Sequence, residues 1–150
     1  MTSSPTAATE AYAGFWRRVL AAIIDNILWG IIAAVVLWLA YGRAYFDRLE
    51  QGVPGPPLES LMSWVLPTVA TIAFWVTRGA TPGKMAVGAR IVDARSGATP
   101  SLGRCILRYL AYFVSVLPLG LGLIWVAFDP RKQGWHDKIA GTLVVRDRSR

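Results

Sequence analysis

The feature that most limits what this chain can fold into is an apolar run at residues 19–41, VLAAIIDNILWGIIAAVVLWLAY. Only Asp25 and Asn26 interrupt it with strong polarity. A helix of 23 residues is long enough to cross the roughly 30 Å hydrocarbon core of a bilayer. A cleaved signal peptide would have a shorter apolar region, of roughly 7–15 residues. We therefore expect a membrane-spanning helix, with Trp16 and Trp38 near the two headgroup levels.

Two further apolar segments follow, at residues 61–77 and 109–128. The second apolar segment, at 61–77, has Ser60 as a candidate N-cap and contains Pro67, which we expect to disturb the helix. The third apolar segment, at 109–128, carries no charge but has helix-breaking residues in its middle, namely Pro118, Gly120 and Gly122. It either crosses the bilayer as one kinked span or turns near Pro118 and returns to the side from which it came.

The predicted fold class is an all-α integral membrane protein, a small bundle of three apolar segments with a short β-hairpin on the cytoplasmic side. The β-branched alternation of residues 86–94 and the sequence TLVV at 142–145 predict two paired strands, and residues 95–97 predict a turn. A length of 150 residues indicates one domain. We place the membrane domain at residues 12–146, between a flexible tail at 1–11 and a short tail at 147–150.

Charge predicts the orientation. The net charge is +7, and residues 78–108 and 129–150 each hold six Lys or Arg, whereas 42–60 hold two. Basic flanks stay in the cytoplasm, so we expect a multi-pass protein of a bacterial-type plasma membrane with its N-terminus inside. If the two strands pair, the carboxyl tail lies inside as well, which favours a returning third segment. Membrane flanks account for the basic residues, so we expect no nucleic-acid partner.

Asp25 is the most informative residue, because a carboxylate in hydrocarbon needs a partner or a water-filled cavity to offset its desolvation. Arg18 lies two helical turns earlier on the same face, too far along the helix for direct pairing. Each side chain should therefore meet groups on another segment or another copy of the chain. The alternative is that Arg18 extends to lipid phosphates while Asp25 and Asn26 are packing groups that bond between helices.

Three titratable residues follow the third segment and are candidates to join Asp25 in an ion or proton site: Asp129, His136 and Asp137. An unperturbed histidine titrates near neutral pH. A purely structural alternative has Asp129 making a turn with Pro130 and Asp137 pairing with Lys138 at the interface.

Several sharper functions are not supported. The sequence GATPGK at 79–84 has one residue too few between its glycines for a phosphate loop, and we interpret it as a turn in which Gly83 takes positive φ. Cys105 is the single cysteine, and no metal-ligand spacing, nucleophile elbow or dinucleotide fingerprint is present. We predict no metal, no cofactor and no enzymatic activity. Small residues at Gly30, Ala33 and Ala34 could let another helix approach.

Three fragments, GFWRRVLAAIID, TPGKMAVGARIVD and FDPRKQGWHDKIAGTLVV, occur in order around the apolar segments, and together they resemble the RDD family of membrane proteins over about residues 12–146. The resemblance assigns the family's Arg to Arg18 and its two Asp to Asp25 and Asp137, with Asp129 the weaker candidate for the last.

The family is largely uncharacterised, with transport of unknown ligands proposed and cation/proton antiport reported for some members. The resemblance therefore implies a transporter of an ion or small ligand. Because 150 residues provide few helices for a translocation path, we expect it to act as a homo-oligomer. Our leading hypothesis is that Asp25 binds a cation or proton, while Asp137 and Arg18 set its charge state and access. The rival expectation is a membrane scaffold whose basic cytoplasmic face docks a partner or anionic lipid.

Overall fold

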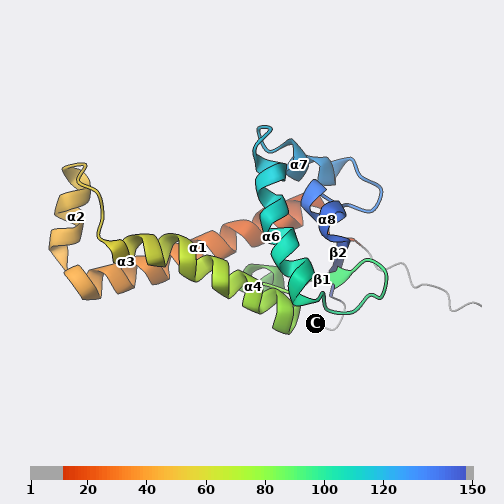
Figure 1. Ribbon diagram of the computed structural model, residues 1–150, viewed down its shortest axis with the longest axis horizontal. Helices are drawn as coiled ribbons and strands as arrows, with labels where there is room; N and C mark the ends of the chain where they lie inside the picture. Colours follow the sequence, from red (N-terminus) through yellow and green to blue (C-terminus); the bar gives the residue numbers. More distant parts are fainter. Residues whose placement is uncertain (1–11, 148–150) are drawn as a thin grey trace, which may run out of the picture.

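A long helical hairpin joined to a group of short elements makes up the structure (Figure 1). The computed structural model describes residues 12–147. Helix α1 (Phe15–Tyr41) leads away from the short elements, and α2 (Arg43–Glu50) turns the chain at the far end. The chain then returns along α1 through α3 (Pro57–Ser60), η1 (Leu61–Val65) and α4 (Leu66–Arg78). We call the end that holds α2 the distal end.

The short elements gather at the opposite end of the hairpin. In chain order they are α5 (Pro82–Ala86), β1 (Ala89–Asp93), α6 (Leu102–Val116), α7 (Leu121–Ile124), η2 (Trp125–Ala127), α8 (Trp135–Ala140) and β2 (Thr142–Arg146). Helix α8 packs along α6, and α5 packs against α1. We call this region the sheet end, comprising α5, β1, α8, β2 and the parts of α1, α4 and α6 that contact them.

The apolar segments agree with the predicted membrane class. Phe15–Tyr41 and Pro57–Arg78 are each long and apolar enough to cross a bilayer. The third segment consists of Leu102–Val116 and Leu121–Ala127, bent by 111° at the break between them. The chain turns beside Pro118, where Leu119 and Gly120 both have positive φ. Helix α8 then packs along α6, so the chain beyond the bend comes back toward the sheet end, as the returning form of the third segment requires.

The second span differs in detail from its prediction. It begins at Pro57, in the first helical position, so Ser60 lies inside the helix and is not its N-cap. The predicted disturbance at Pro67 takes the form of the π turn η1 within a continuous helix. This wider turn ends two residues before Pro67, which has no N–H group to donate to the carbonyl four residues earlier.

The predicted strand pair is confirmed. Strand β1 is antiparallel to β2, with Ala89 opposite Arg146 and Asp93 opposite Thr142. The predicted turn follows β1, where the Asp93 carboxylate accepts hydrogen bonds from two backbone N–H groups and Gly97 has φ 70°. The segment just before α1 joins the same sheet, because Tyr12 forms a β-bridge with Val145 and Ala13 N–H donates to the Val144 carbonyl at 2.9 Å. The amino end of α1, β1 and β2 therefore lie at one end of the molecule.

The clusters of buried apolar side chains lie at the sheet end. Its main cluster brings α4, both strands and α6 together around buried residues: Ala13, Trp75, Ala89, Ile91, Cys105 and Val144. Along α1, by contrast, large apolar side chains such as Ile27 and Ile31 are exposed, as expected of a surface that faces lipid. The predicted tails at 1–11 and 147–150 lie outside the described residues, apart from Asp147.

Candidate functional site

A buried ion cluster centred on Asp137 lies at the sheet end. Asp137 is in the first turn of α8, and its carboxylate accepts hydrogen bonds from Arg18 Nη1 at 2.6 Å and, more closely, from Arg108 Nη1. The backbone N–H of Gly134 donates to the same carboxylate at 2.9 Å. Burial alone would raise the pKa of Asp137, but the Arg108 and Arg18 guanidinium groups hold it well below its usual range. Asp137 is therefore ionised and doubly paired.

Arg18 joins three segments of the chain. In addition to Asp137, its guanidinium donates to the Ala13 carbonyl at 3.2 Å and to the Lys132 carbonyl. Its side chain is only 13% exposed, so it turns into the protein and does not extend toward lipid phosphates. The sequence correctly required a partner on another segment, but it could not say which one.

Arg108 completes the cluster, and the sequence analysis missed it as a site residue. Its guanidinium lies near the rings of Trp75 and Tyr112, at 5.2 and 5.7 Å from their centroids, and its Nη1 also donates to Thr142 Oγ1 at 2.6 Å. A signal was present, because Arg108 lies on a stripe of α6 at helical spacing that is buried throughout: Cys105, Arg108, Ala111 and Ser115. From the sequence alone, Arg108 counts only among the basic flanks.

Asp25 meets the loop that leads into α5. Its carboxylate accepts hydrogen bonds from Thr81 Oγ1 at 2.5 Å and from Gly83 N–H at 2.6 Å. The prediction that Gly83 takes positive φ is wrong, since Gly83 lies inside α5. Glycine is needed there for close approach, because a Cβ atom would lie 2.1 Å from the Ala21 carbonyl oxygen. Through these two hydrogen bonds, Asp25 holds α5 against α1.

The remaining acidic and amide candidates have local partners. Asn26 donates to the Ala22 carbonyl of its own helix at 2.8 Å. Asp129 caps a turn through the N–H groups of Arg131 and Gln133, and it pairs with Lys138 Nζ at 2.5 Å. The suggested pairing of Asp137 with Lys138 is therefore wrong. Consecutive residues of a helix point about 100° apart, so one of these two faces the interior and the other the surface.

His136 is buried beside the ion cluster. Its ring stacks on Tyr112 with centroids 4.0 Å apart, and its backbone N–H donates to Ser115 Oγ at 3.1 Å. Burial lowers the pKa of His136 to about 3, although Asp137 opposes this shift. The imidazole is consequently neutral near pH 7 and does not titrate there as an unperturbed histidine would.

Two adjoining cavities are lined by several of these charged and polar side chains. The larger, which we call the span cavity, has a volume of about 400 Å³ and lies between α1, α4, α5 and α6; its polar lining includes Asp25, Asn26 and Lys84. The smaller, which we call the arginine cavity, has a volume of about 160 Å³ and is lined by Arg18, Lys84 and Arg108 among others. Lys84 borders both cavities.

The Lys84 ammonium is the one cation of this region without a fixed partner. Within residues 12–147 it makes no hydrogen bond or salt bridge, and its nearest aromatic contact is the Trp75 ring, 5.8 Å from Nζ to centroid. Burial lowers the pKa of Lys84, an effect that nearby Tyr112 opposes and Arg108 reinforces. Lys84 therefore gives up its proton more readily than an exposed lysine does.

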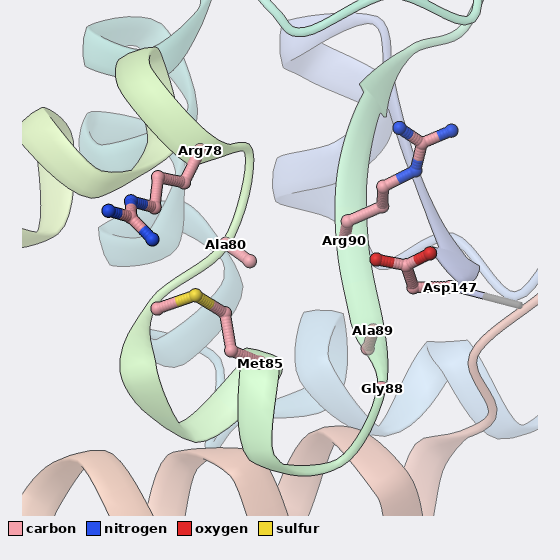
Figure 2. Close-up of a pocket in the computed structure, with 7 residues that line it drawn as sticks. All are labelled: Arg78, Ala80, Met85, Gly88, Ala89, Arg90 and Asp147. Atoms are coloured by element: carbon pink, nitrogen blue, oxygen red, sulfur yellow. The ribbon is translucent and has the colours of Figure 1, made fainter. Parts of the chain in front are cut away.

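A third cavity, of about 150 Å³, lies at the sheet end between the end of α4 and β1. Figure 2 shows its lining, with Arg78 reaching from α4 and Arg90 from β1. The two guanidinium groups point away from each other, so they do not converge on a common ligand position. Across residues 12–147 no three His, Cys, Asp or Glu side chains gather as metal ligands.

The comparisons with known proteins give one family and several uncharacterized relatives. The model of the RDD family matches residues 12–141. The uncharacterized protein YckC of Bacillus subtilis is 35% identical over 138 residues, which cover 89% of this chain and 83% of the relative. The uncharacterized membrane protein YteJ of the same organism is 29% identical over 154 residues, covering 93% and 84% respectively.

A third relative, the uncharacterized protein RP437 of Rickettsia prowazekii, is 39% identical over 75 residues, which cover 50% of this chain and 41% of the relative. No solved structure matches the chain.

Proposed function

Because the chain belongs to the RDD family, we propose that it is a small membrane transporter that moves an ion through the span cavity and exchanges a cation for a proton. The observation that carries this proposal is the charge placed inside that cavity. The Asp25 carboxylate and the Lys84 ammonium both line a space of about 400 Å³ between two candidate spans. Ionisable groups at membrane depth usually belong to ion or proton pathways.

The Asp25 carboxylate retains the capacity to bind a cation. An ionised carboxylate has about four lone-pair sites, and Thr81 and Gly83 occupy one each in the structure. Lys84 supplies a second titratable group in the same cavity, and burial has already lowered its pKa. In the proposed exchange, Asp25 receives the cation while the Asp137 cluster, held by Arg18 and Arg108, anchors the helices around it.

Charge also supports an orientation. We place the sheet end in the cytoplasm of a bacterial-type cell and the distal end outside. The first loop, near α2, holds only Arg43 and Arg48, whereas the basic residues of 78–108 and 129–150 belong to the segments that form the sheet end. Lys and Arg are retained on the cytoplasmic side of the plasma membrane.

Two spans and one bent segment are few helices to enclose an ion pathway, so the proposed transporter works as a homo-oligomer. The small face at Gly30 is free for such a contact, because a Cβ atom there would meet nothing within 4 Å. Small residues let membrane helices approach closely.

A scaffold role is the second candidate, and a specific observation favours it. Both signature carboxylates have partners within the chain: Asp137 pairs with Arg18 and Arg108, and Asp25 fastens α5. In the scaffold role these contacts hold the helices together, and the basic sheet end docks a partner or anionic lipid.

Ion flux decides between the two candidates. Purified protein would be reconstituted into vesicles that contain a pH-sensitive dye, and sodium, potassium or lithium would then be added outside. Exchange predicts a cation-dependent pH change inside the vesicles. Asp25→Asn, which removes the charge but keeps the shape, should abolish it.

Asp47→Asn is the matched control, because Asp47 is an exposed carboxylate on α2 and should not affect transport. Wild-type vesicles that pass none of these ions would overturn the transport proposal. Normal flux in Asp25→Asn would exclude Asp25 as the ion-binding group. If Asp25→Asn instead lowers the melting temperature and the wild type shows no flux, the scaffold role stands.

A further inference from the structure

The arginine cavity collects more positive charge than the carboxylates near it can neutralise. We propose that it binds a phosphate group, supplied either by free inorganic phosphate or by the headgroup of an anionic phospholipid. The inference goes beyond the transport proposal, because it concerns a different cavity and an anion. Its charged lining consists of Arg18, Lys84 and Arg108.

The balance of charge is the first support. Arg18 and Arg108 share the single carboxylate of Asp137. Asp25, the other carboxylate nearby, lies in the span cavity, where its oxygens accept hydrogen bonds from Thr81 and Gly83. His136, which also lines the arginine cavity, is neutral near pH 7 because burial lowers its pKa to about 3. Buried charges are normally paired, so the excess cation calls for an anion.

The second support is a pair of donors that have no acceptor. The Lys84 ammonium, on a half-buried side chain, makes no hydrogen bond or salt bridge within the described residues. The Nε atom of Arg108 is buried and likewise has no hydrogen-bond partner in residues 12–147. Buried polar groups in folded proteins nearly always have partners, and an orphaned one indicates an unseen water or ion. A phosphate group, which has several acceptor oxygens, can serve more than one donor at once.

Size and surroundings suit such a ligand. A volume of about 160 Å³ accommodates about five water molecules at about 30 Å³ each, and therefore a phosphate group. The rest of the lining is largely apolar, with Phe15, Val19, Leu123 and Val126. An apolar wall strengthens the attraction between the anion and the cations.

The position along α1 explains why a lipid headgroup is one of the two sources. Arg18 lies in the first turn of α1, which also carries the highly exposed ring of Trp16. Tryptophan side chains at the end of a membrane span mark the headgroup level. A phosphate on the surrounding lipid and a phosphate from the cytoplasm would thus both reach the cavity at this level.

The test measures phosphate binding to the purified full chain. In a neutral detergent, inorganic phosphate would be titrated at constant ionic strength against chloride, with the melting temperature and calorimetric heat as readouts. The lipid arm places the protein in nanodiscs of phosphatidylcholine with or without phosphatidylglycerol, and native mass spectrometry then counts retained phospholipids. A response in the first arm identifies free phosphate, and one in the second identifies the headgroup.

Lys84→Met, which keeps the length of the side chain but removes its charge, should weaken the responding arm by about tenfold or more, the worth of one charge-assisted hydrogen bond. Lys84→Arg should restore binding. Lys138→Met is the matched control, since Lys138 pairs with Asp129 at the surface and should leave binding unchanged. Melting curves of all variants separate loss of binding from loss of folding.

Two results would overturn the proposal: no response to phosphate or phosphatidylglycerol beyond that to chloride, or equal binding by wild type and Lys84→Met. Neither depends on ion flux. A chain that binds phosphate but passes no cation would retain this inference and lose the transport proposal, and the opposite pattern would do the reverse.

Discussion

The sheet end and the distal end of the molecule are built from the same chain but held together by different means. Most of the buried side chains lie at the sheet end, including fully buried polar ones such as Asp137 and Thr142. Toward the distal end, the second half of α1 has one buried residue, Leu37, and α2 has one, Tyr45. One end makes its own interior, and the other needs the bilayer to cover it.

A pair of ion contacts shows what this difference means energetically. At the sheet end, Asp137 and Arg108 are almost completely buried and form part of a triad with Arg18. At the distal end, Arg43 and Asp47 are 87% and 54% exposed and lie 3.8 Å apart. A buried pair that loses one partner leaves an uncompensated charge, whereas water replaces the partner of an exposed one. Similar chemistry should therefore have very different consequences at the two ends.

The largest expected effect comes from Asp137→Asn, which leaves Arg18 and Arg108 without their shared counter-ion. Breaking such a buried cluster should lower the free energy of unfolding by about 3–5 kcal/mol. Asp47→Asn is the matched change at the distal end and should cost less than about 0.5 kcal/mol. Denaturant or thermal unfolding in detergent measures both. If both variants lose the same free energy of unfolding, the proposed difference between the sheet end and the distal end is wrong.

A second test uses pH, which should act on the sheet end through the buried His136. The pKa of His136 is about 3 in the folded protein, below its value of about 6.5 when unfolded, so between these values the unfolded chain binds the extra proton. Stability should thus fall as pH drops from about 6.5 toward 3, by up to about 1.4 kcal/mol per pH unit.

His136→Asn removes the titrating group, and its melting temperature should change less over the same range. The Asp137 carboxylate adds a loss only at lower pH, because its pKa lies below its unfolded value. A wild-type profile that is flat between pH 6.5 and 4 would contradict a buried, neutral His136.

The smallest expected effect concerns close packing against α1. Gly83→Ala places a Cβ 2.1 Å from the Ala21 carbonyl oxygen and 2.8 Å from Asp25 Cγ, so α5 must move and the cost should be about 1–3 kcal/mol. Gly30→Ala is the control, because Gly30 lies in an exposed part of α1 where an added Cβ would meet no atom within 4 Å. If Gly30→Ala is the more harmful of the two in unfolding assays, another copy of the chain covers Gly30.

Most of the architecture was predictable, because its signals are local. The length of the first apolar run indicated a span, Pro118 and Gly120 indicated the break in the third segment, and the alternation in β1 indicated a strand with a partner near the carboxyl end. The errors were also local. Pro57 rather than Ser60 begins the second span, and Gly83 serves close approach rather than a turn, since tertiary contact overrides what a short motif suggests.

The candidate site was only half predictable. Arg18, Asp25 and Asp137 stood out because charges in or beside apolar runs are costly and need a reason. Arg108 and Lys84 did not, because basic residues near a membrane are ordinarily flanks, and their burial follows only once α5 and α6 have packed.

What the sequence by itself determined is where lipid-facing helix, strand and turn occur, since hydrophobic length and periodicity act within a few turns of the chain. What only the tertiary structure decided is which charges meet. Asp137 is 119 residues from Arg18 and 29 from Arg108, and its neighbour Lys138 faces elsewhere. Pairing over such separations depends on how the helices pack, and a rotation of one residue along α8 changes the partner.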